Sequence, residues 1–218
     1  NIEAGTGEGA TPITLTYGFD IDIGAADETE ALSMVSLGDV AVYANDCFRL
    51  GEHRVAAPAM DDRVACALLV SVMQALPKTR NTVIAVFSTQ EEVGCRGAKT
   101  AAYSVDPDIG IALDVTSNGD TPETKLPAIK LGEGAAVKIM DRGSISNPDL
   151  VRELLAAGER AGVKTQREVL PFGGTDAMAM QVSRSGVIAG TVSIPCRYVH
   201  SACEVVDLRD VEAARALL

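Results

Sequence analysis

The sequence has no tryptophan, and aromatic residues make up only 4% of its 218 residues. Stacking platforms for sugars or nucleic-acid bases are therefore not expected. Histidine occurs only twice, as His53 and His200, and this scarcity restricts any metal hypothesis. No apolar run approaches the roughly 18 residues needed to cross a bilayer, and the first residues show no basic-then-apolar signal segment. We expect no membrane partner.

Disulfide spacing and net positive charge are also absent. Five cysteines are an odd number with no framework spacing, which indicates reduced thiols in a cytoplasmic protein. Lys and Arg number 19 against 30 Asp and Glu, so the net charge is −11. Such a chain is a poor candidate for nucleic acid and a better one for metal ions or amine-bearing ligands. Its 47% apolar and 22% charged residues are ordinary globular values.

The sequence pattern changes near Pro58. Before it, alternating or β-branched runs predict strands at 13–17, 19–23 and 39–43, with a short helix at 27–34. These runs are too few to close a core of their own. We therefore predict a β-rich segment at 1–57 and a separate α/β domain at 58–218.

From Pro58 onward, predicted helices and strands alternate. Helical spacing of apolar residues predicts helices at 61–76, 97–104, 148–161, 175–184 and 208–218. Runs of β-branched and other apolar residues predict strands at 82–87, 109–115, 137–140 and 187–194. The alternation predicts an α/β fold with a mostly parallel sheet and helices on both faces.

Acidic and imidazole side chains fall at the ends of these strands and at the start of the helix after Pro58. In α/β sheets, ligands collect at the carboxyl ends of the strands. The residues concerned are Asp61, Asp62, Glu91, Glu92, Asp114 and His200. Carboxylates so close together repel unless a cation holds them, and oxygen ligands with an imidazole suit zinc, cobalt or manganese. Neighbouring side chains in extended backbone point in opposite directions, so one of Glu91 and Glu92 can bind metal while the other acts as a general base.

Each of these residues also has a purely structural explanation. Carboxylates at a helix start complement the helix dipole, and a loop after a strand is commonly polar. The alternatives are a helix-dipole pair at Asp61-Asp62, a solvated loop at Glu91-Glu92, a turn residue at Asp114 and a hydrogen-bonded core histidine at His200. The spacing alone leaves both interpretations open.

Six motifs stand in a fixed order along the chain. They are 59–63 (AMDDR), 90–98 (QEEVGCRGA), 112–116 (ALDVT), 119–122 (GDTP), 173–177 (GGTDA) and 194–201 (IPCRYVHS). Together they resemble the M42 family of metalloaminopeptidases, which includes the deblocking, glutamyl and tetrahedral aminopeptidases and members labelled endoglucanase M. The resemblance covers residues 20–218.

The resemblance implies a zinc-peptidase-like fold and a centre of two divalent ions, zinc, cobalt or manganese. Asp61 would bridge both ions, Asp114 would bind one, and Glu92 and His200 would bind the other. Glu91 would be the general base on a metal-bridging water. Asp62 would be a structural neighbour, joined to Asp61 by a cis peptide bond.

The same resemblance implies an activity and an assembly. The reaction would be hydrolysis of the N-terminal peptide bond of a peptide substrate. Substrate binding would involve the motif residues Gly173, Gly174, Thr175 and Asp176. The protein would be a homo-oligomer built from dimers, up to a dodecamer.

One ligand of the family is absent. The family has a fifth ligand, a histidine in a His-x-Asp context upstream of the bridging aspartate, with a β-rich dimerisation-type domain inserted between them. Here His53 lies only eight residues before Asp61 in a polar loop, which predicts a surface residue. We therefore expect the 218 residues to lack the family's first portion, with 1–57 as the trailing part of the inserted domain.

Two other functions stay open at this point. The missing histidine is compatible with a catalytically impaired homologue that serves as an assembly or binding protein. The endoglucanase labels raise glycoside hydrolysis, which needs two carboxyl groups on either side of a sugar ring. The low aromatic content and the metal-like cluster argue against the second of these.

Overall fold

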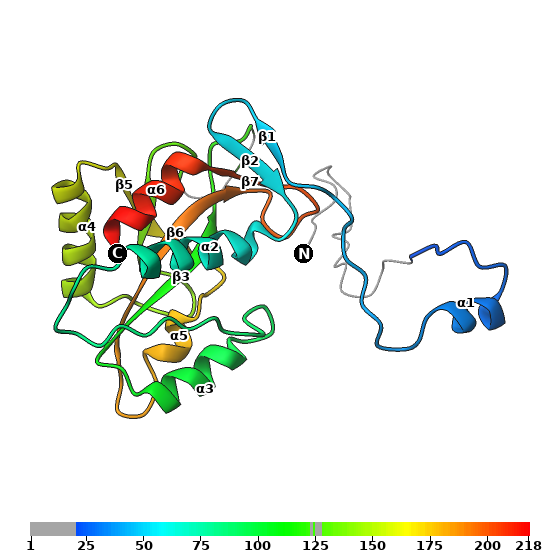
Figure 1. Cartoon of the computed structure of the whole chain (residues 1–218), viewed down its shortest axis with the longest axis horizontal. Helices are drawn as coiled ribbons and strands as arrows, with labels where there is room; N and C mark the ends of the chain where they lie inside the picture. The colour runs from blue at the N-terminus through cyan, green and yellow to red at the C-terminus, as the bar shows by residue number, and fades with distance from the viewer. Residues whose placement is uncertain (1–20, 123, 125–127) are drawn as a thin grey trace. The chain divides into compact units, whose positions relative to one another are not determined.

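The computed structural model describes residues 21–122, 124 and 128–218. The chain divides into two units, 1–44 and 45–218 (Figure 1). This division precedes the boundary expected after residue 57, because the segment 45–57 contributes two strands to the sheet of the second unit.

Among residues 21–44 of the first unit, the regular element is helix α1 (Glu28–Met34). It starts with a reciprocal cap, in which Asp27 Oδ1 accepts from the Glu30 N–H at 2.9 Å and Glu30 Oε2 accepts from the Ala26 N–H at 2.8 Å. None of residues 21–44 is buried. The strand predicted at 39–43 is wrong, because this exposed stretch pairs with no other described segment. The strand predicted at 13–17, and most of that at 19–23, lie outside the described residues, and 21–23 are not in a strand.

The second unit is built on one mixed sheet. Its strands are β1 (Phe48–Leu50), β2 (Arg54–Ala57), β3 (Ile109–Ser117), β4 (Ala135–Met140), β5 (Thr165–Val169), β6 (Ile188–Arg197) and β7 (Glu204–Asp207). They run in the order β1-β2-β7-β6-β4-β5, and β3 pairs with the other edge of β6. The two longest ladders, β3–β6 and β4–β5, are parallel, and shorter antiparallel pairs complete the sheet. Strand β6 is therefore the central strand.

Helices cover both faces of this sheet, as predicted. They are α2 (Met60–Ala75), α3 (Arg96–Val105), α4 (Pro148–Ala161), α5 (Ala177–Met180) and α6 (Leu208–Leu217). Gly110 on β3 lies against Met180 of α5, whereas Gly190 on β6, the partner of Ile111, lies against Leu150 of α4. Because neighbouring strand residues face opposite sides, α4 and α5 lie on opposite faces. Helices α2, α4 and α6 pack together on one face, and α3 packs with α5 on the other (Figure 1).

The main core lies between the sheet and the group α2, α4 and α6. Val192 and Ile194 of β6 are fully buried there, beside Val137 of β4, Leu154 of α4 and Ala214 of α6. Met60 of α2, next to Asp61, and Val199, next to His200, pack against this core. The α/β class is confirmed.

One predicted strand of this unit is not formed. Residues 82–87 pair with no other described segment, and Ile84 and Phe87 are 54% and 53% exposed. The β-branched composition favours a strand, but a strand also needs a hydrogen-bonded neighbour. In the part of the chain that the structure describes, no helix is long and apolar enough to cross a membrane.

Candidate metal centre

The four predicted metal ligands come from separate elements and meet at one place. Asp61 lies in the first turn of α2, Asp114 lies inside β3, and Glu92 lies in the turn before α3. His200 lies in the turn between β6 and β7. The Asp61–Asp62 peptide bond is cis, as the resemblance implied. The ligand atoms of these four residues form two clusters, one with Glu92 and His200 and the other with Asp114, and Asp61 belongs to both. None of the four side chains therefore points away from the others.

The outer side of the site consists of Glu92 and His200 around Asp61. His200 Nε2 lies 3.0 Å from Asp61 Oδ2 and 3.1 Å from Glu92 Oε2. Hydrogen bonds to these two carboxylates raise the pKa of His200 to about 10. The hydrogen bond from His200 in turn lowers the pKa of Glu92. The side chains of His200 and Glu92 are 57% and 56% exposed, so this side opens to solvent.

The inner side consists of Asp62 and Asp114 around Asp61. Ligand oxygens of the three carboxylates lie within 4.8 Å of one another. Burial, followed by the charges of Asp114 and Asp61, raises the pKa of Asp62 to about 10. Burial and the charge of Asp61 also raise the pKa of Asp114 well above its ordinary value. Asp62 Oδ1 is buried without a hydrogen-bond partner, which is costly for a carboxylate unless a proton or a cation satisfies it.

The donor set fits two divalent cations. One group offers two carboxylates and an imidazole, and the other offers three carboxylates, with Asp61 common to both. Carboxylate oxygen and imidazole nitrogen are ligands for zinc, cobalt and manganese. Positive charge between the crowded carboxylates would offset the repulsion that raises the pKa of Asp62 and Asp114.

Glu91 belongs to a different group from its neighbour Glu92. Its Oε1 accepts from the Cys95 thiol at 3.2 Å, and Asp176 lies in the same group. Burial is the main cause that raises the pKa of Glu91. Asp176 Oδ2 also accepts from the Ser88 hydroxyl. The adjacent glutamates thus face different partners.

The residues predicted to bind substrate lie at the start of α5. Gly173 has a φ of 66°, and a Cβ on Gly174 would approach Met178 Sδ to 3.0 Å. Thr175 is 1% exposed, and its hydroxyl shares a 3.0 Å hydrogen bond with that of Thr191 on β6. Thr175 therefore anchors this turn to the sheet, while Asp176 reaches the Glu91 group.

Two sets of polar contacts were not predicted. Arg197, at the end of β6, donates to both carboxylate oxygens of Asp120 at 2.9 Å. Glu204, at the start of β7, accepts from the backbone N–H groups of Asp61 and His200. The sequence offered one sign of Glu204: it is an acidic residue directly before the apolar pair Val205-Val206, four residues after His200. His53 is half-exposed beside Glu52 and lies in neither group of site residues.

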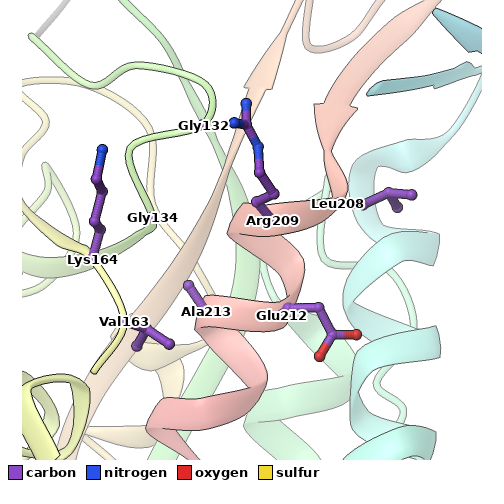
Figure 2. Close-up of a pocket in the computed structure, with 8 residues that line it drawn as sticks. All are labelled: Gly132, Gly134, Val163, Lys164, Leu208, Arg209, Glu212 and Ala213. Atoms are coloured by element: carbon purple, nitrogen blue, oxygen red, sulfur yellow. The ribbon is translucent and has the colours of Figure 1, made fainter. Parts of the chain in front are cut away.

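A cavity of about 440 Å³ lies apart from these ligands, between α6 and the loops that precede β4 and β5. Arg209, in the first turn of α6, extends past Gly132, and Lys164 rises beside Gly134 (Figure 2). Both cations already have carboxylate partners, Asp207 for Arg209 and Glu133 for Lys164. This arrangement leaves the carboxylate cluster around Asp61 as the candidate for chemistry.

Comparison with known proteins identifies the family of this chain. The sequence profile of the M42 glutamyl aminopeptidase family matches residues 6–217. A protein of Acetivibrio thermocellus is 44% identical over 91% of this chain and 60% of its own length. The lysyl aminopeptidase of Pyrococcus furiosus is 36% identical over 91% of this chain and 58% of its own length. The chain therefore spans less than two thirds of these relatives.

Solved structures show the same fold. An aminopeptidase from Desulfurococcus kamchatkensis matches 90% of this chain and 56% of its own, with a TM-score of 0.85 and 38% identity. The TET1 peptidase of Pyrococcus horikoshii, described as assembling into a tetrahedron or a large octahedral shell, matches 96% of this chain and 66% of its own, with a TM-score of 0.79 and 32% identity. The chain belongs to the M42 glutamyl aminopeptidase family.

Proposed function

We propose that this chain carries most of the active site of a dinuclear-metal aminopeptidase, in which Glu91 is the general base. The observation that carries the proposal is the pair of donor groups that share Asp61, with Glu91 next to them in a group of its own. Asp61 would bridge two ions, Asp114 would hold the inner one, and Glu92 and His200 would hold the outer one.

The two ions, when bound, would supply Lewis-acid polarisation of the scissile carbonyl and a more acidic attacking water. Glu91 takes a proton from that water and then delivers it to the nitrogen of the leaving amine. Burial supports this role, because it raises the pKa of Glu91 above that of an ordinary glutamate and brings it closer to neutral pH. The Cys95 thiol, which donates to Glu91 Oε1, holds the carboxylate in place.

The proposed substrate is a peptide with a free amino terminus. Carboxylates outnumber cationic groups around Asp61, and the chain as a whole carries a charge of −11, so a protonated amine is attracted to the site. Two relatives are named lysyl aminopeptidase and glutamyl aminopeptidase, after terminal residues of opposite charge. We therefore propose the substrate class and no particular terminal residue.

The proposal extends to assembly and location. We infer a homo-oligomer, supported by the shells described for the TET1 peptidase of Pyrococcus horikoshii. We also infer that the segment predicted at 1–57, of which 45–57 joins the sheet of the second unit, is the trailing part of an inserted dimerisation-type domain. A cytoplasmic protein fits the five cysteines, all of which are free.

The test is peptide hydrolysis by the full-length gene product, followed by mass spectrometry. A peptide with a free amino terminus and its N-acetylated twin are incubated with the protein and zinc or cobalt. We expect stepwise loss of N-terminal residues from the free peptide only, and no loss after a chelator is added. Metal binding without cleavage would favour a non-catalytic binding protein, and cleavage of the acetylated twin would contradict an aminopeptidase.

A further inference from the structure

Glu204 makes an unusual pair of contacts at the candidate metal centre. It is 2% exposed, and its two carboxylate oxygens accept from two different backbone N–H groups. Oε2 accepts from Asp61 at 2.9 Å, and Oε1 accepts from His200 at 2.6 Å. One carboxylate thus joins the backbones of two predicted metal ligands that lie far apart in the sequence.

Neither of these N–H groups has a partner in regular structure. Asp61 lies in the first turn of α2, where backbone N–H groups have no acceptor within the helix, and its ψ of 102° is not helical. His200 has a φ of 63°, in the left-handed region that few side chains favour. Among the described residues, the acceptor for both N–H groups is Glu204. Glu204 thus supplies the acceptor that regular secondary structure does not give to either N–H group.

The two backbone contacts to Glu204 bring the segments of Asp61 and His200 together, so that their side chains can meet. With both N–H groups held, His200 Nε2 and Asp61 Oδ2 lie 3.0 Å apart. Two tetrahedral ligands, each about 2.0–2.1 Å from a zinc ion, lie about 3.3 Å apart. This side-chain spacing is close to the ligand spacing at one zinc ion.

We propose that Glu204 is a positioning residue that pre-arranges Asp61 and His200 for metal binding. The inference rests on the proposed function, since it gives these two residues the role of ligands. Glu204 itself does not touch the metal in this proposal. It acts through the two peptide groups that carry the ligands.

Asp210 offers a matched control within the same chain. It is fully buried, and its carboxylate also accepts from two backbone N–H groups, those of Gly132 and Gly134, both at 2.7 Å. These glycines line the cavity of Figure 2 and not the metal centre. Loss of one carboxylate oxygen from Asp210 therefore reproduces the structural damage of the Glu204 change without touching the predicted ligands.

The test compares Glu204→Gln with Asp210→Asn in the full-length protein. Zinc affinity is measured by competition with a chromophoric chelator, and thermal unfolding is measured in metal-free buffer. Each amide retains one acceptor oxygen and turns an N–H donor toward the second backbone amide, so both variants should unfold at a lower temperature than wild type. Glu204→Gln should also weaken zinc binding by about 10–100-fold, the usual effect of losing an outer partner of a ligand. Asp210→Asn should bind zinc as wild type does.

The visible absorption of the cobalt-loaded protein gives a second readout. Its bands should change in Glu204→Gln and stay the same in Asp210→Asn, because only the first alters ligand geometry. Wild-type zinc affinity in Glu204→Gln, or an equal loss in both variants, would overturn the positioning role and leave the proposed function standing. A wild-type protein that binds no zinc would overturn both.

A second variant covers the case in which Glu204→Gln does not fold. Glu204→Asp keeps the charge, but its shorter side chain cannot reach both N–H groups. We expect a zinc affinity below that of wild type, with a normal two-state unfolding transition. Unchanged affinity in Glu204→Asp would overturn the inference.

Discussion

The inner and outer sides of the candidate centre share Asp61, but they hold their charges in opposite ways. On the outer side, His200 supplies a positive partner, so the pKa of Glu92 falls and that of His200 rises to about 10. On the inner side, burial and the neighbouring carboxylate charges outweigh the backbone hydrogen bonds of Asp62 and Asp114, so the pKa of each rises. The outer side is an ion pair that can exist without metal, whereas the inner side needs protons or a cation.

Because of this difference, a bound metal ion would displace protons from different groups on the two sides. An inner ion would displace protons from crowded carboxylates, and an outer ion would displace the proton of His200. Glu91 belongs to neither side, and changes at the three places should therefore have separable effects.

The largest expected effect is the loss of catalysis in Glu91→Gln, a change that leaves the proposed ligands on both sides of the centre intact. Glu91→Gln removes the proposed proton acceptor, so kcat should fall by about 10²–10⁴-fold while KM changes little. Metal content should stay at the wild-type level because Glu91 is not a proposed ligand. Steady-state rates and metal analysis of the full-length variant check both statements. Loss of metal in Glu91→Gln, with metal retained in Glu92→Gln, would reverse the assigned roles.

The next effect distinguishes the two sides directly. Glu92→Gln removes a proposed outer ligand, and Asp114→Asn removes a proposed inner one. Each variant should lower the affinity for one of the two zinc ions and leave the other ion bound. The loss should exceed about 100-fold, the upper end of the effect of losing a hydrogen-bond partner of a ligand. Zinc titration by calorimetry should then show one tight ion per chain in each variant. Two tight ions in either variant would remove that residue from the ligand set.

The pH dependence of the metal-free protein should separate the sides by their pKa values. The pKa of Asp62 is about 10 in the folded state and 3.8 as an ordinary aspartate. Between these two pH values only the folded state keeps the Asp62 carboxyl protonated, so the free energy of unfolding falls as pH rises from 3.8 to about 10. His200 has a folded pKa of about 10 against 6.5, so its contribution is complete below 6.5 and is lost as pH rises toward 10.

Thermal unfolding in a chelator, from pH 4 to pH 10, measures this slope. The unfolding temperature should fall across the range, and Asp62→Asn should flatten it from the acid end upward. His200→Gln should flatten it only above about pH 6.5. A metal-free protein that becomes more stable between pH 4 and pH 10 would contradict this description of both sides.

The smallest effect concerns the hydrogen bond to the proposed base. The Cys95 thiol donates to Glu91 Oε1 at 3.2 Å. Cys95→Ala removes this donor, and kcat should fall by about two- to tenfold, the range of one ordinary hydrogen bond. Cys95→Ser restores a donor and should recover most of the rate, as steady-state kinetics would show. A loss as large as that of Glu91→Gln would mean that Cys95 does more than orient the base.

Local signals predicted the regular elements where the end residues were strong. Helix α4 spans Pro148–Ala161 as expected, because Asn147 Oδ1 caps its first N–H groups and Gly162, with a φ of 68°, ends it. Helix α5 is shorter than the predicted 175–184, and Arg184 already has a φ of 50°, which a continuous helix does not allow.

Long-range pairing was beyond local signals. Residues 82–87 have strand composition, but whether they form a strand depends on a neighbour that composition does not reveal. Strand β7 was not predicted at all, because four residues between a turn and the start of α6 carry little periodicity. Its pairing with β2 and β6 is what brings Glu204 to the start of α2.

The same division holds for the site. Asp61, Glu92, Asp114 and His200 were found from residue type, position and family motif, and the fold brings them together. Glu204 was missed because its contacts are to backbone N–H groups in two distant segments, which no motif of side chains describes.

The central claim is that two divalent ions at this site are required for peptide hydrolysis. The direct measurement is metal content per chain of the full-length protein, determined together with aminopeptidase rate during chelation and re-addition of zinc or cobalt. We predict two ions per chain in the active protein, a rate that falls as they are removed, and recovery when they return. Full activity in protein with no bound divalent ion would contradict the claim.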